Sequence, residues 1–183
     1  MTSCVALFRA VNVAGHQKVA MDDLRTMLSG LGYAGVASLL QSGNVVFRGG
    51  ARPPRELERE IERAAAAQLG LEADVFVRTA AEWSAIVDAN AFPEEAENDP
   101  GRLIVAALKD EPRATAVAAL QGAITGRERV RCAGRHAYIV YPDGMGRSRL
   151  TTAVIERKLG TRCTCRNWNT VLRLRAALAD PGR

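Results

Sequence analysis

Two short polar segments in the first quarter of the sequence carry side chains that can recognise an anion. These side chains are Arg9, Asn12 and Lys18 in the first segment and Gln41, Ser42 and Asn44 in the second. Guanidinium and ammonium groups bind phosphate or carboxylate oxygens, while amides and hydroxyls orient them. The alternative is structural: residues 41–44 are typical of a tight turn, in which the side chain of Gln41 or Asn44 ties down the loop around Asn12.

A second polar cluster is expected near the end of the chain. It contains Arg147, Arg149, Arg166, Asn167, Trp168 and Asn169. Ser148 and Asn167 are residue types that begin helices, and the free backbone N–H groups of a helix start, with arginines beside them, favour an anion. A base or ring can then stack on Trp168. The alternative is that Ser148 and Asn167 only cap their helices, Trp168 anchors the last helix in the core, and the arginines are solvated.

Other reactive side chains are poorly spaced for metal binding or catalysis. Cys132 and His136 flank a turn, and Cys163 and Cys165 have one residue between them, whereas paired zinc cysteines usually have two or more. His16 and His136 have no recognisable acidic partner, which a nucleophilic mechanism needs. We therefore predict no metal ion and no cofactor, and the sequence assigns no reaction.

The apolar pattern of the first half predicts the order β-α-β-β-α-β. The run Cys4–Phe8 is continuously apolar, which indicates a strand in the centre of its sheet. Apolar residues recur at helical spacing after Met21 and Pro53. The predicted strands are 3–11, 36–40, 45–48 and 74–78, and the predicted helices are 21–31, 53–69 and, as a connection, 79–90.

The second half repeats this order without visible residue identity to the first. Its predicted strands are 102–108, 128–132, 136–141 and 162–165, and its predicted helices are 112–121, 148–159 and, at the end, 167–179. Residues 93–101 are rich in proline and acidic side chains and are expected to form a linker with turns. We therefore predict an α+β protein made of two tandem ferredoxin-like βαββαβ units with antiparallel sheets, residues 1–92 and 102–183.

This topology predicts which polar segments meet. In a βαββαβ unit, the end of the first strand and the turn between the second and third strands lie at one edge of the sheet, so residues 12–18 are expected beside 41–44. The opposite edge holds the loop after the third strand and the end of the fourth. In the second unit these are residues 141–149 and 166–169. The two clusters form one cleft only if those edges face each other.

Three stretches of sequence carry a family resemblance. They are Phe8–Gly15, Leu40–Phe47 and Arg166–Val171, which stand near the start, in the first quarter and near the end of the chain. Together they resemble the bacterial family called domain of unknown function 1697, over nearly the whole chain. The resemblance implies a pair of ferredoxin-like units and brings no established reaction.

Charge is unevenly distributed along the chain. From Arg127 to Arg183 there are 13 basic and 4 acidic residues, whereas Met1 to Gly126 has 12 and 16. A basic region attracts phosphate-bearing partners, although 22 arginines against 3 lysines also indicate a general compositional bias. No apolar run is long enough to span a bilayer, the N-terminus lacks the basic stretch of a signal peptide, and four cysteines are too few for a disulfide framework. We therefore expect a cytoplasmic protein with no membrane partner.

Together these features favour a protein that binds an anionic partner, either a phosphorylated small molecule or a nucleic acid. RNA binding on a sheet face is disfavoured, because the third strand, Val45–Arg48, has only one aromatic residue. Two alternatives stay open: a small enzyme with a site between the units, and a scaffold or interaction protein whose polar motifs only lock loops.

Overall fold

The computed structural model describes residues 1–12 and 18–179. His16 and part of the Phe8–Gly15 motif lie outside the described residues. The chain forms two compact units: the first is Met1–Ala85 with a segment that begins at Arg173, and the second is Ile86–Leu172. Within the described ranges, no helix is both long and apolar enough to cross a membrane.

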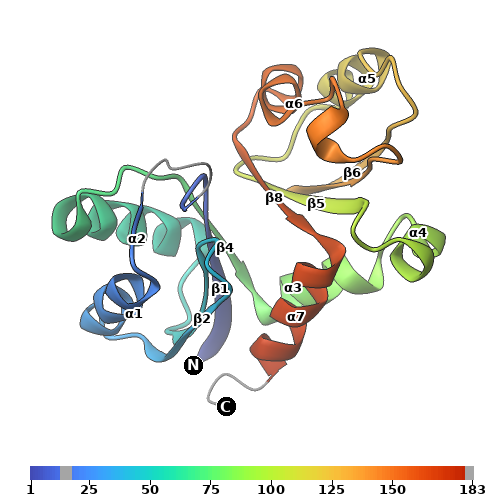
Figure 1. The fold of residues 1–183 in the computed structure, drawn as a ribbon. Coiled ribbons are helices and arrows are strands. Elements are labelled where there is room, and N and C mark those ends of the chain that lie inside the picture. Colours follow the sequence, from blue (N-terminus) through green and yellow to red (C-terminus); the bar gives the residue numbers. More distant parts are fainter. Residues whose placement is uncertain (13–17, 180–183) are drawn as a thin grey trace. The chain divides into compact units, whose positions relative to one another are not determined.

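The first unit has a four-stranded antiparallel sheet in the order β2-β3-β1-β4. Its elements are β1 (Thr2–Phe8), α1 (Met21–Gly30), β2 (Ala34–Leu39), β3 (Asn44–Gly49), α2 (Pro54–Leu69) and β4 (Val75–Thr79). β1 is central, with Cys4–Phe8 buried, as its continuous apolar sequence predicts. Helices α1 and α2 cover one face (Figure 1), and Leu24, Leu57 and Ile61 pack there against alternate residues of the strands.

The second unit has the same order of elements and a sheet in the order β6-β7-β5-β8. Its elements are β5 (Leu103–Leu108), α5 (Ala114–Gly122), β6 (Arg129–Ala133), β7 (His136–Val140), a 3-10 turn η1 (Met145–Arg147), α6 (Thr152–Leu159) and β8 (Cys163–Asn167). Helices α5 and α6 lie on one face (Figure 1), over a core that includes Ala106, Ile139 and Ile155. The fold is thus mixed α+β, with two four-stranded antiparallel sheets.

Two predictions of local structure were wrong. The predicted helix at Ser148 begins at Thr152, because Thr151 is the N-cap: its hydroxyl accepts the Val154 N–H at 3.3 Å. The Ser148 hydroxyl instead accepts the Leu150 N–H at 2.9 Å and donates to Glu128. Part of the expected linker forms helix α4 (Pro93–Asn98), in which proline at the start and glutamates in the first turn suit a helix N-terminus.

Helices α3 (Ala80–Asp88) and α7 (Trp168–Ala179) follow the last strand of each unit, as the sequence predicts. Each begins with a side-chain cap. Thr79 and Glu82 exchange backbone N–H bonds at 2.8 and 3.1 Å in a capping box, and Asn167 accepts the Thr170 N–H at 3.0 Å. Both caps are the last residues of their strands, so the strand passes directly into the helix.

The edge strands β4 and β8 are covered by carboxylates from the preceding helix. Glu62 and Glu58, one turn apart on α2, accept the N–H groups of Val75 and Val77 at 2.8 and 3.0 Å. On α6, Glu156 accepts the Cys163 N–H at 2.9 Å. These bonds occupy backbone donors that an open sheet edge would otherwise present to another chain.

Candidate functional site

The end of the first strand is tied to its neighbours in the same way in both units. Phe8 donates its N–H to Gly43 and Arg9 to Asp74, at 2.8 and 2.9 Å. In the second unit Leu108 donates to Arg135 and Lys109 to Arg162, at 2.9 and 3.0 Å. The two units therefore provide an internal comparison, position by position, around this strand end.

The two polar segments of the first unit are longer than their counterparts. Residues 9–20 connect β1 to α1, whereas residues 109–113 make the equivalent connection in the second unit. Residues 40–43 connect β2 to β3, whereas residues 134–135 suffice between β6 and β7. The additional residues are not needed to form this order of elements, and extended loops on a common scaffold are where binding groups usually lie.

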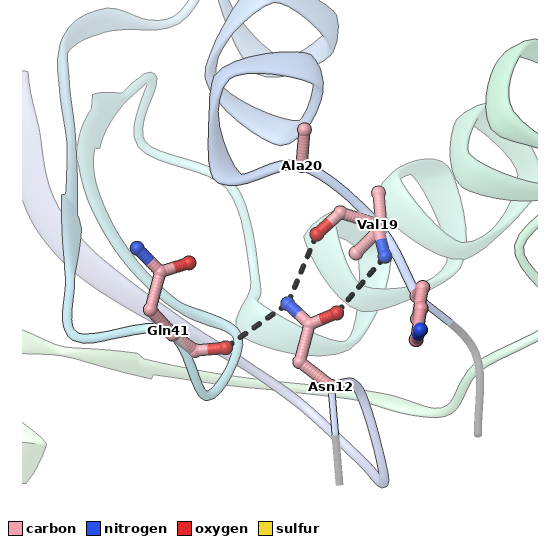
Figure 2. Close-up of a pocket in the computed structure, with 5 residues that line it drawn as sticks. Asn12, Val19, Ala20 and Gln41 are labelled. Carbon is pink, nitrogen blue, oxygen red and sulfur yellow. Dashed lines mark hydrogen bonds between the residues drawn. The ribbon is translucent and has the colours of Figure 1, made fainter. Parts of the chain in front are cut away.

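Asn12 joins these two segments. Its amide nitrogen donates to the carbonyls of Val19 at 2.9 Å and Gln41 at 3.0 Å, and its amide oxygen accepts the Val19 N–H at 2.9 Å. Figure 2 shows its carboxamide between the two segments, with all three bonds. The predicted meeting of the two segments is confirmed. The bond runs from the side chain of Asn12 to the backbone of the turn, not from a side chain of the turn.

The side chains of Ser42 and Asn44 hold the turn together. Asn44 is fully buried, and its amide donates to the Leu39 carbonyl at 3.1 Å and to the Ser42 hydroxyl at 3.0 Å. Their polar atoms are therefore engaged within the hairpin, which leaves the Gln41 side chain as the exposed polar group of the turn.

Unusual backbone conformations gather at the same place. Among the described residues, the non-glycine residues with positive φ are Ala10, Asn12 and Leu40, at 55°, 57° and 62°. Side chains disfavour this left-handed region, and such strain concentrates at functional sites. Asparagine tolerates it better than alanine or leucine, so Asn12 suits both the backbone and the bonds that it makes.

Gly43 is required by close packing as well as by its φ of +71°. A Cβ atom there would lie 2.9 Å from the Cβ of Phe8 and 3.3 Å from that of Val11. We expect Gly43→Ala to lower the free energy of unfolding by about 2–5 kcal/mol, since left-handed strain costs about 1–2 kcal/mol and overpacking adds about 1–3 kcal/mol.

The second unit provides the matched control for Gly43. Gly134 lies in the equivalent turn with φ +52°, and nothing stands within 4 Å of a Cβ built there. Gly134→Ala should therefore cost only the conformational term, about 1–2 kcal/mol. Urea unfolding of both variants measures the difference; equal losses would show that the contacts with Phe8 and Val11 are unimportant.

A cavity of about 420 Å³ opens where the two segments meet. The described residues that line it are Asn12, Lys18, Val19, Ala20 and Gln41. Figure 2 labels Asn12, Val19, Ala20 and Gln41 near the start of α1. Lys18 and Gln41 are exposed. Ala20 is the N-cap of α1 and has no side-chain acceptor for the first N–H groups of the helix.

Charges near the cavity are of both signs. Asp22 and Asp23 lie in the first turn of α1, and Asp22 forms an ion pair with Arg25. Arg9 lies 3.9 Å from the carboxylate of Asp74 and is not among the described residues that line the cavity. Of the cations predicted for this cluster, Lys18 is therefore the one at the cavity.

In the second predicted cluster, Trp168 and Arg166 take structural positions. Trp168 is 4% exposed, so its ring is not available for stacking by a ligand. The guanidinium of Arg166 donates to the Thr164 hydroxyl and the Cys165 carbonyl, both at 2.8 Å. Burial lowers the pKa of Arg166 to about 10, which leaves it protonated at neutral pH.

Arg147, Arg149 and Asn169 are exposed. Arg147 lies near Asp143. The Asp143 carboxylate accepts two hydrogen bonds from the guanidinium of Arg127, at 2.5 and 3.2 Å. The bonded Arg127, and then the positive charges of Arg102 and Arg147, hold the pKa of Asp143 below its usual value. Several arginines thus converge on one carboxylate in the loop after β7.

The cysteine thiols differ in pKa. A hydrogen bond with Cys163 lowers the pKa of Cys165. Burial raises the pKa of Cys132 and brings that of Cys4 to about 11, which keeps both as thiols at neutral pH. Across residues 1–12 and 18–179, no three histidine, cysteine or acidic side chains are grouped closely enough to hold a metal ion.

Comparison with family models identifies the first three quarters of the chain. The model described as "Protein of unknown function (DUF1697)" matches residues 1–138. The chain belongs to this family. The DUF1697 match includes Asn12, Gln41 and Asn44 and ends before the Arg166–Val171 stretch, so the resemblance seen in the sequence is confirmed for its first two stretches.

Comparison of this chain with solved structures extends over nearly the whole fold. The conserved bacterial protein SP0830 from Streptococcus pneumoniae is 19% identical, with a TM-score of 0.75, and the match covers 97% of this chain and 98% of that one. At this identity the likeness shows the fold alone. No curated protein matches the chain.

Some of the residues around these sites were not predicted from the sequence. Val19 and Ala20 line the cavity of this DUF1697 chain, and their place directly before a helix that begins at Met21 is the signal that identifies them. The sequence predicts Arg127, Arg129 and Arg131 only as part of a basic region. A more informative feature is that these three arginines occupy every second position of the sequence.

Proposed function

We propose that the first unit binds a small anionic molecule in the cavity lined by Asn12, Lys18 and Gln41. The observation that carries the proposal is the comparison of the two units. The second unit makes the same strand-end hydrogen bonds with shorter connections, whereas the first has two longer segments that meet through Asn12, and described residues of both line the cavity.

Each group at the cavity has a distinct role in this proposal. The ammonium of Lys18 supplies the charge that attracts the ligand, and the exposed carboxamide of Gln41 supplies a donor and an acceptor. The uncapped start of α1 adds backbone N–H groups and the positive end of the helix dipole. Asn12 is a positioning residue, because its three bonds go to the protein backbone.

The order of helices and strands along the chain, and of the strands in each sheet, is compatible with a ferredoxin-like βαββαβ arrangement in each unit. We therefore propose a tandem of two such units. On this frame, the cavity occupies the sheet edge at which the first strand ends.

A scaffold or interaction role is the second candidate, and one observation favours it. The bonds made by Asn12, Ser42 and Asn44 all remain within the protein, which is what locked loops require. A scaffold with locked loops predicts no small ligand, so ligand screening separates the two candidates.

The direct test is a thermal-shift screen with phosphorylated and carboxylated metabolites, followed by calorimetric titration. A ligand at 100 times its Kd should stabilise the native protein by about 2.7 kcal/mol. Lys18→Gln should weaken binding at least tenfold. Lys158→Gln, which removes the same charge from the second unit, should leave it unchanged. A screen in which no compound stabilises the protein, or a Lys18→Gln variant that binds normally, would overturn the proposal.

A further inference from the structure

Three arginines alternate along the free edge of the second sheet. They are Arg127, just before β6, and Arg129 and Arg131 within it. β6 pairs only with β7 in its sheet, so it is an edge strand. Val130 is buried in the core beneath the helices and Cys132 packs against that core, so Arg129 and Arg131 point to the opposite face. All three arginines are exposed.

Local contacts orient two of these side chains. Two guanidinium nitrogens of Arg127 donate hydrogen bonds to the carboxylate of Asp143. Arg129 forms an ion pair with Glu95, and its guanidinium lies 5.1 Å from the centre of the Phe92 ring. Arg131 donates to the Val130 carbonyl at 3.2 Å. The side chains of Arg127 and Asp143 are 69% and 63% exposed, and water-exposed pairs of this kind contribute little and exchange readily.

One further cation lies at the start of this row. The exposed Arg147 lies near Asp143, the carboxylate that pairs with Arg127. Among the described residues, neither Arg131 nor Arg147 forms an ion pair. The row therefore offers Arg131, Arg147 and, through its exchangeable pair, Arg127, whereas Arg129 is held by Glu95.

We propose that this arginine row docks the phosphate backbone of a single-stranded nucleic acid. Arg129 and Arg131 are alternate residues of a strand, about 6.6 Å apart, and Arg127 directly precedes that strand. Arginine can donate two parallel hydrogen bonds to phosphate oxygens, which lysine does not. A basic track that follows the backbone is the electrostatic part of how such strands are bound without sequence preference, beside the stacking of bases on aromatic rings. The row lies in the second unit and is independent of the cavity proposed in the first.

The test is the salt dependence of binding to a fluorescent 20-nucleotide single strand of mixed sequence. Each phosphate contact on a single strand contributes a slope of about −0.7 in log K against log salt, so contacts from Arg127, Arg131 and Arg147 predict about −2.1. Arg127→Gln with Arg131→Gln should make the slope about 1.4 less steep and leaves the Arg129–Glu95 pair in place. Asp143→Asn removes a competing charge and should tighten binding about fivefold at 0.1 M salt.

The matched control is Arg59→Gln with Arg63→Gln, which removes two exposed charges from α2 in the first unit. It should leave the slope unchanged, and circular dichroism confirms that each variant is folded. Absence of salt-dependent binding by the native protein, or an equal loss in the control, would overturn the proposal. Equally tight binding of poly-glutamate with the same dependence on Arg127 and Arg131 would also overturn it, in favour of an acidic protein partner.

Discussion

Replacing Glu58 with alanine should destabilise the protein by about 3–5 kcal/mol, because it removes an acidic partner of a buried arginine. Glu58 on α2 lies 3.5 Å from the guanidinium of Arg78 on β4, and the two side chains are 4% and 3% exposed. The same carboxylate accepts the Val77 N–H. The substitution therefore removes a counterion of a buried arginine and an acceptor of the edge strand together.

Two companion variants separate these contributions. Glu62→Ala removes the acceptor of the neighbouring Val75 N–H, and it should cost about 1–2 kcal/mol. Glu58→Leu combined with Arg78→Met replaces the pair by apolar groups and should restore most of the stability. Urea unfolding followed by circular dichroism measures all three. A loss for Glu58→Ala no larger than that for Glu62→Ala would show that the buried charge is not the cause.

Replacing Asn12 with aspartate should lower the free energy of unfolding by about 2–4 kcal/mol and weaken ligand binding at least tenfold. A carboxylate has the shape of the amide and keeps the left-handed backbone, but it has no N–H to donate to the carbonyls of Val19 and Gln41. Each of the two lost hydrogen bonds costs about 0.5–1.5 kcal/mol, and the new negative charge, which faces both carbonyls, adds to this loss. The two extended segments then lose their direct link.

The control for Asn12 lies in the second unit. Asn169→Asp makes the same chemical change at an exposed position in the first turn of α7 and should alter stability by less than about 0.5 kcal/mol. Thermal unfolding and titration with a ligand from the screen report both effects. If Asn12→Asp unfolds like the native protein, the three hydrogen bonds do not hold the segments together.

Much of the fold could be predicted because its signals are local. The continuous apolar run Cys4–Phe8 indicates a central strand, and β1 is central in its sheet. The meeting of Asn12 with Gln41 followed from the order of elements alone, since that order places both segments at one edge. The direction of the bond could not be predicted, because an amide both donates and accepts and its orientation depends on the φ of Asn12.

The errors near the end of the chain have physical causes. Ser148 and Thr151 are both good N-cap residues, and the sequence does not show that Glu128, twenty positions away, engages Ser148. Trp168 and Asn169 are adjacent on one helix, and only the packing shows which is buried. The net charge of residues 127–183 predicts a basic region. The more specific feature is that Arg127, Arg129 and Arg131 occupy alternate positions at one edge of the sheet.

The two hydrogen bonds between Asn12 and Val19 affect which sequence changes the connection between β1 and α1 tolerates. These bonds join the two ends of the connection. The residues between Asn12 and Val19 can therefore change in type or number while β1 and α1 keep their places. Doubling the length of a closed segment costs only about 0.6 kcal/mol. Relatives that keep the asparagine can therefore accept insertions and substitutions there while the scaffold is inherited intact.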